Sequence, residues 1–74
     1  MKKNKKNCKE LLDGYYELLL FENGSCVEKV NADKMFVFRG EYERLFAFEK
    51  TRPSVYKLVV NKYSSSGEFE KNVQ

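Results

Sequence analysis

The chain has 74 residues, a formal net charge of +3 and no histidine. This length supports one domain, close to the lower limit for a self-sufficient hydrophobic core. Without histidine, the two cysteines form neither a zinc site nor a Cys-His nucleophile, and no glycine-rich phosphate loop is present. We therefore expect a protein that is not an enzyme and that has no cofactor and no metal ligands.

The charge is unevenly distributed along the chain. Residues 1–9 contain five lysines and no acid, whereas residues 10–33 contain six acids and one lysine, and residues 34–63 contain seven basic and three acidic residues. A start made of Lys and Asn buries too little apolar surface to become ordered. We therefore expect a disordered basic tail at residues 1–8 and a single β-rich domain at residues 9–72.

No secretory or membrane-spanning apolar run is found in the sequence. This indicates a cytoplasmic location and no membrane contact. In that compartment Cys8 and Cys26 are expected to be free thiols, and a disulfide between them is the alternative.

The first part of the domain is predicted to be a short helical turn at residues 9–12, followed by a β-hairpin. Strands are predicted at residues 15–22 and 25–31, because Asn23 and Gly24 between two strand-like runs suit a type I′ turn. The register expected from this turn pairs Phe21 with Cys26, Leu20 with Val27 and Leu18 with Lys29. The alternative is one helix over residues 8–21. The apolar run from Leu18 to Phe21 indicates a strand that is buried on both sides.

Residues 34–63 contain three apolar runs rich in aromatic and β-branched residues, which favours three further strands. The predicted loops are Gly40 to Tyr42 and Thr51 to Pro53. With three-residue loops, the even-numbered residues of all three strands lie on one dry side of the sheet. These residues are Phe36, Phe38, Phe46, Phe48, Tyr56, Leu58 and Val60.

Ser64 to Gly67 reads as a flexible turn, and residues 68–70 as a short last edge strand anchored by Phe69. The predicted fold is mainly β, a small antiparallel five-stranded meander curled into a half-barrel with a short N-terminal helical turn. The alternative is an α+β fold with one N-terminal helix on a four-stranded antiparallel sheet.

The function expected from this inventory is stoichiometric association with a larger protein, because catalytic groups are absent and tyrosine is abundant. The candidate contacts are Tyr42 at a loop tip, together with Arg39, Arg44, Arg52 and Lys57. The alternative is a small β-barrel that binds single-stranded nucleic acid, since cationic residues alternate with aromatic ones in residues 34–63. Homodimerisation stays open, because a second chain would enlarge the thin core.

In its small size and its Lys- and Asn-rich composition, the chain is similar in style to accessory proteins of phages or mobile elements. Some of those proteins inhibit host defence nucleases. No motif supports this likeness.

Overall fold

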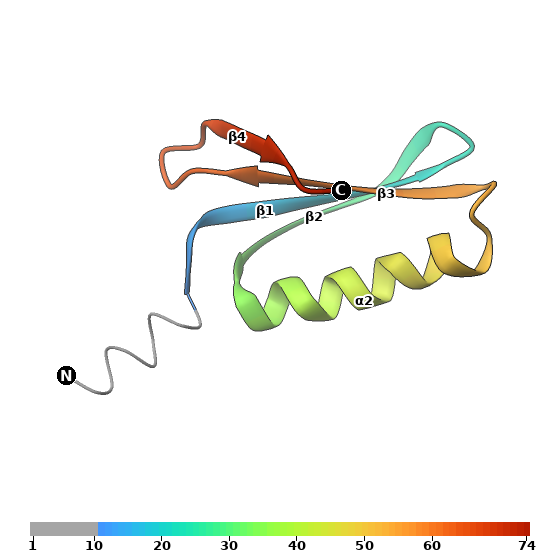
Figure 1. Cartoon of the computed structure of the whole chain (residues 1–74), viewed down its shortest axis with the longest axis horizontal. Coiled ribbons are helices and arrows are strands. Elements are labelled where there is room, and N and C mark those ends of the chain that lie inside the picture. Colours follow the sequence, from blue (N-terminus) through green and yellow to red (C-terminus); the bar gives the residue numbers. More distant parts are fainter. Residues whose placement is uncertain (1–10) are drawn as a thin grey trace.

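The computed structural model describes residues 11–74 and contains one antiparallel sheet with one helix on one of its faces (Figure 1). The spatial order of the strands is β2-β1-β3-β4, so β1 and β3 are central and β2 and β4 are the edges. The elements are β1 (Leu11–Glu22), β2 (Ser25–Lys34), α2 (Met35–Thr51), β3 (Tyr56–Tyr63) and β4 (Phe69–Asn72).

The architecture is therefore mostly β with one helix. It fits the α+β alternative, with a four-stranded open sheet in place of the five-stranded half-barrel. The helix lies between β2 and β3 in the sequence, not at the N-terminus, and residues 11–21 are strand. The proposed tail at residues 1–8 and Cys8 lie outside the described residues, as do residues 9 and 10 of the predicted helical turn.

The hairpin between β1 and β2 is confirmed, because Asn23 and Gly24 both have positive φ (53° and 87°), as a type I′ turn requires. Phe21 pairs with Cys26 as predicted, but the rest of the predicted register is wrong. An irregularity between Leu20 and Phe21 shifts the pairing by one residue, so that Leu18 lies opposite Val30. The predicted register would have placed a lysine beside Leu18 on the buried face, and the one-residue bulge avoids this.

The two strands predicted on either side of Gly40 are wrong, because residues 35–51 form α2. Phe38, Tyr42 and Phe46 recur every four residues, which places them on one side of a helix. The even-numbered aromatics do not share a dry side, since Phe36 is 63% exposed and Phe48 is 38% exposed.

Pro53 lies in a turn as predicted, but Thr51 is still helical and the connection covers residues 52–55 between α2 and β3. The proline explains where α2 ends. Arg52 precedes the proline and has non-helical torsion angles (φ −140°, ψ 71°), as expected for a residue in that position. Its N–H still donates to the Phe48 carbonyl oxygen at 3.0 Å. The Thr51 hydroxyl donates to the Ala47 carbonyl oxygen at 2.8 Å, which satisfies another group of the last turn.

The hydrophobic core lies between α2 and the sheet. Leu45 is the one fully buried residue of the helix, and the strands supply alternate residues from β1, β2 and β3. The sheet residues in the core are Leu18, Leu20, Ala32, Leu58 and Val60. Consequently the intervening residues of the same strands face away from the helix.

The predicted last edge strand is confirmed as β4, which follows a turn at residues 64–67. Phe69 remains 58% exposed, and its ring meets the Tyr63 ring edge-on at 5.8 Å. Pairing to β3 continues past β4, because the Val73 N–H donates to the Val60 carbonyl oxygen at 2.7 Å. Over residues 11–74, α2 is too short and too polar to cross a membrane.

Candidate binding surface

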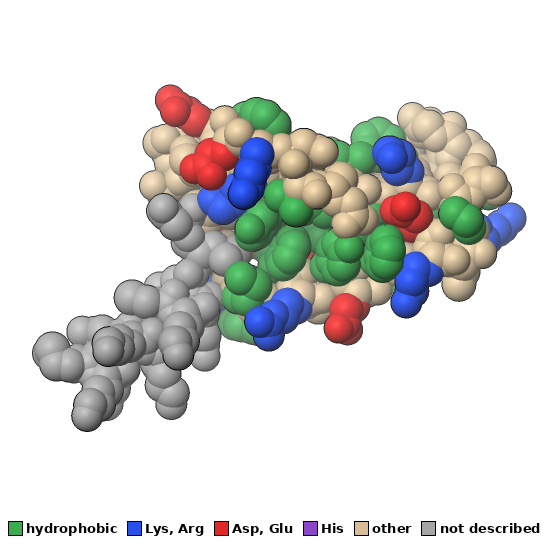
Figure 2. Space-filling view, in the orientation of Figure 1, with side chains coloured by type: hydrophobic (Ala, Val, Ile, Leu, Met, Phe, Trp, Pro, Cys, Tyr) green, Lys and Arg blue, Asp and Glu red, His purple; other side chains and the backbone are tan. Residues whose placement is uncertain are grey.

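Tyr42, predicted at a loop tip, lies in the middle of α2. Its ring stacks on Phe46 at 5.3 Å and tilts against Phe38 at 5.8 Å, and its hydroxyl donates to the Gln74 side chain at 2.6 Å. Figure 2 shows hydrophobic side chains gathered along the seam between the helix and the sheet. Tyr42 is half-buried and packs against the core, so it is not a free contact residue.

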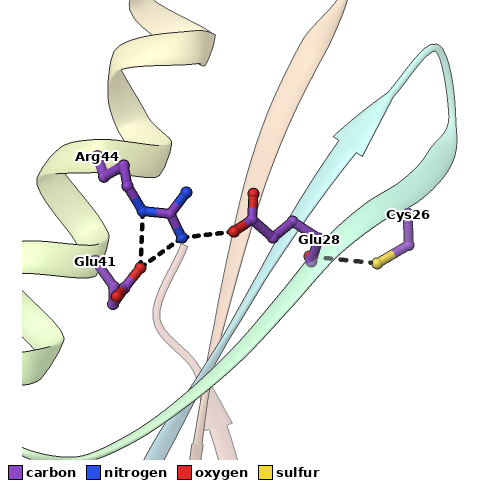
Figure 3. A network of polar contacts seen from close by, with 4 residues as sticks. All are labelled: Cys26, Glu28, Glu41 and Arg44. Atoms are coloured by element: carbon purple, nitrogen blue, oxygen red, sulfur yellow. Dashed lines mark hydrogen bonds and ion pairs between the residues drawn. The ribbon is translucent and has the colours of Figure 1, made fainter.

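Arg44 also lies on α2, where its guanidinium bridges the helix to β2 (Figure 3). It donates to Glu28 at 2.5 Å and to Glu41, one turn away, at 2.6 Å. The hydrogen bond from Arg44 lowers the pKa of Glu28, and the two carboxylates raise the pKa of Arg44. Both partners of the arginine belong to its own chain, and the pair with Glu28 joins α2 to β2.

Cys26 lies at the end of the same network and is an exposed free thiol (Figure 3). Its Sγ lies 3.5 Å from the Glu28 carbonyl oxygen, to which it donates. The alternative of a disulfide with Cys8 concerns a residue outside the described part of the chain.

The remaining predicted contact residues do not form one patch. Arg39 is exposed on α2, and Arg52 is exposed just after the helix. Lys57 lies opposite Phe21 in the pairing of β3 with β1 and next to the buried Leu58, so its side chain faces away from the helix. Of the five candidates, Lys57 alone lies on the uncovered side of the sheet.

We call that uncovered side the open face. Its centre is apolar, because Leu19 of β1 lies opposite Val59 of β3 and both side chains are half-buried. Strand alternation and the observed register assign the other members. These are Tyr15, Glu17 and Phe21 of β1, Lys29, Asn31 and Asp33 of β2, and Lys57, Asn61 and Tyr63 of β3, with Phe69 of β4 beside Tyr63.

One end of the open face carries a hollow of about 530 Å³ between the β1–β2 turn and the α2–β3 loop. Phe21, Val59 and Lys57 line it from the sheet, and Pro53 and Val55 line it from the loop. The loop is fixed to the turn, since the Asn23 N–H donates to the Val55 carbonyl oxygen at 2.8 Å. The hollow is therefore a preformed and largely apolar depression with one cation at its rim.

The other end of the open face is aromatic. The Tyr15 and Tyr63 rings are nearly parallel, with centroids 5.1 Å apart and an interplanar angle of 5°. The Phe69 ring packs edge-on against the Tyr63 ring. The rings contact each other across three neighbouring strands, so this end presents a rigid aromatic surface.

Between the aromatic end and the apolar pair of Leu19 and Val59 lies Glu17, whose side chain is only 14% exposed. It pairs with Lys29 at 3.4 Å and accepts hydrogen bonds from Asn61 and from the Tyr63 hydroxyl, each at 3.3 Å. Burial, followed by the negative charge of Glu17, raises the pKa of Tyr63. The carboxylate is thus held by three partners from its own chain.

Sequence reasoning missed this surface, although a signal was present. β1 and β3 both contain unbroken apolar runs, Leu18 to Phe21 and Leu58 to Val60. The prediction that the first run is buried on both sides holds for Leu18 and Leu20, whereas Leu19 and Phe21 on the open face are only half-buried. Two such runs on paired strands indicate a sheet with apolar side chains on both faces, so that its second face is also suited to burial.

Comparisons with protein-family models, with curated protein sequences and with solved structures gave no significant match. In the described part of the chain, no three His, Cys, Asp or Glu side chains are grouped so as to hold a metal ion. The functional proposal therefore depends on the geometry of the open face.

Proposed function

We propose that the protein acts by stoichiometric association with a larger protein that covers the open face. The observation in support is the cross-strand pair of Leu19 and Val59. These apolar side chains lie at the centre of a sheet face that no other described element covers. Strands with unbroken apolar runs are typical of sheets covered on both faces, and uncovered apolar patches are typical of protein interfaces.

The surroundings of this pair match the anatomy of such an interface. Aromatic residues are enriched at protein contacts, and Tyr15, Tyr63 and Phe69 form one end of the open face. The hollow beside Phe21 and Lys57 suits an apolar anchor side chain next to an acidic group. Such binding inhibits a larger enzyme when it blocks a functional surface, which is the activity we favour.

Binding of single-stranded nucleic acid is the second candidate, because the open face carries aromatic rings and lysines. Two features weigh against it. The lysines Lys29 and Lys57 are balanced by Glu17 and Asp33 on the same face, so the described face has no net positive charge. The Tyr15 and Tyr63 rings also stack on each other, which leaves less free ring surface for stacking on bases.

The test uses the tagged full-length chain and a lysate of the cells in which it naturally occurs. A retained protein is identified, purified and titrated with the chain by calorimetry. We expect saturation at a fixed whole-number ratio. The substitution Val59→Lys should weaken binding by about tenfold or more, because it places a charge at the centre of the contact.

Ala47→Lys is the matched control, because Ala47 is exposed on α2, away from the open face. It should bind as the original chain does. Equal binding by Val59→Lys and the original chain, with both folded by circular dichroism, would contradict the proposal. Titration with a mixed oligonucleotide pool tests the second candidate, for which affinity should fall steeply as salt is raised.

A further inference from the structure

In the part of the chain that the structure describes, the outer edge of β2 is a long edge of the sheet without a strand partner. Within residues 11–74 no strand lies beyond β2. The part of the β3 edge that β4 does not cover has hydrogen-bond partners in its own chain. The Tyr56 N–H donates to the Arg52 carbonyl oxygen at 2.9 Å, and the Leu58 N–H donates to the Glu49 carboxylate at 2.9 Å. The edge of β3 is thus blocked by its own chain.

The register shows which groups of β2 point outward, because successive residues of an antiparallel strand direct their backbone groups to alternate edges. Val60 bonds to the C-terminal segment, so Val59 bonds to β1. The backbone N–H and C=O of its partner Leu19 therefore point toward β3. Those of Leu18 point the other way, toward Val30 of β2. The outward N–H and C=O groups of β2 accordingly belong to Lys29, Asn31 and Asp33.

We infer that this edge binds a second copy of the same chain, antiparallel, with a two-fold axis at Asn31. The charges along β2 support a second copy as the partner. When two β2 strands run antiparallel about Asn31, each charged side chain lies opposite one of the other sign. The opposed pairs are Lys29 with Asp33, Glu28 with Lys34, and Val30 with Ala32, each of which occurs twice.

Neighbouring registers lack this match. An axis at Lys29 or at Asp33 opposes two like charges, and an axis at Val30 or at Ala32 opposes no charge pair. An axis perpendicular to the sheet also requires opposed residues to lie on the same face, as they do in the register centred on Asn31. The charges therefore select one register.

The residues at this edge are accessible for such pairing. The side chains of Lys29, Lys34 and Asp33 are 59%, 46% and 73% exposed. Val27 and Phe36, which lie near the two ends of this edge, are also exposed, at 53% and 63%.

The resulting dimer has an eight-stranded continuous sheet with both helices on one side. About six backbone hydrogen bonds would join the two β2 strands, from the three outward residues of each copy. The open face remains uncovered in this arrangement, so the dimer would present two copies of it.

A charge-exchange experiment tests the register on the full-length chain by analytical ultracentrifugation. The original chain should sediment as a dimer that dissociates on dilution. Asp33→Lys alone and Lys29→Asp alone should each be monomeric, because each opposes like charges. An equimolar mixture of the two variants should recover the dimer mass, since every opposed pair is then complementary.

Two matched variants control for charge alone. Glu43→Lys on α2 and Lys71→Asp on β4 make the same changes at exposed positions away from β2, and both should dimerise as the original chain does. Circular dichroism checks that each variant is folded. A mixture of Asp33→Lys and Lys29→Asp that stays monomeric would overturn the inference.

Asn31→Pro gives an independent test, because it removes an outward N–H that has no strand partner among residues 11–74. The folded variant should be monomeric at concentrations where the original chain is dimeric. An original chain that is monomeric at millimolar concentration would contradict the proposal. So would a dimer that survives Asn31→Pro and both charge reversals, since it would then use another surface.

Discussion

Gly14 and Gly40 differ in whether their positions could accept a larger residue. Gly14 in β1 has φ +107°, and a Cβ built on it would collide with the Tyr63 carbonyl oxygen of the neighbouring strand. Gly40 in α2 does not have positive φ, and a Cβ there would meet no atom within 4 Å. The first glycine is required by the close approach of two backbones, whereas the second only weakens a helix.

We therefore expect Gly14→Ala to destabilise the protein by more than about 1 kcal/mol. Gly40→Ala should stabilise it by about 0.5–1 kcal/mol, because alanine reduces the conformational entropy lost when the helix forms. Urea unfolding followed by circular dichroism measures both. An equal effect of the two substitutions would show that the Gly14 approach is not required.

The Arg44–Glu28 ion pair should make stability depend on pH. The hydrogen bond from Arg44 lowers the pKa of Glu28 in the folded chain below 4.5. The stabilisation by this ion pair is therefore fully present above the pKa that Glu28 has in the unfolded chain. It is lost as the pH falls through the lower pKa of Glu28 in the folded chain. The stability advantage of the original chain over Glu28→Gln should shrink between neutral pH and about pH 3. A constant difference in urea midpoints over that range would contradict this.

At the scale of elements, Glu49 couples α2 to β3. Its carboxylate accepts the Leu58 N–H at 2.9 Å, and Leu58 is only 1% exposed. Without an acceptor, this buried amide would be left without a hydrogen bond. We expect Glu49→Ala to cost about 1–3 kcal/mol in the free energy of unfolding.

Glu49→Gln is the control, because its side-chain oxygen can still accept the bond. It should lose clearly less stability than Glu49→Ala when both are compared by urea unfolding. If the two substitutions cost the same, the hydrogen bond to Leu58 does not contribute as the geometry indicates.

The elements differ in how far the sequence predicts them. The hairpin was predictable because Asn23 and Gly24 fix their turn through local chemistry. The bulge beside Phe21 was not, because it depends on Val30 packing against the core beneath a helix that lies elsewhere in the chain. Helix α2 was missed because Phe36, Phe38, Phe46 and Phe48 fit strand alternation, while the spacing of Phe38, Tyr42, Phe46 and Lys50 at every fourth residue indicates a helix.

At the scale of the whole molecule, the candidate surface was predictable only in part. Lys57, predicted as a partner contact, lies exposed on the open face, whereas Tyr42 and Arg44 are held by partners in their own chain. Which face of β3 stays uncovered depends on where α2 packs, and that placement was not predicted. The paired apolar runs of β1 and β3 were the local signal for the second face.

Hydrogen exchange provides a test across the whole sheet. The amides of the central strands, such as Leu18 and Leu20, should exchange slowly at all concentrations because they lie inside the sheet. The amides of Lys29, Asn31 and Asp33 should exchange rapidly in dilute solution and become protected as the protein concentration rises. Protection of these three amides that does not depend on concentration would argue against pairing between copies.

The order of the elements along the chain has a consequence for synthesis. β1 is a central strand, yet it leaves the ribosome before either of its two neighbours, and α2 separates β2 from β3, the second of them. Until β3 has emerged, the nascent hairpin exposes the apolar side of β1 and also the backbone edge of β1 that later pairs with β3. A polypeptide stalled before Tyr56 should therefore be prone to aggregate, and the completed one should not.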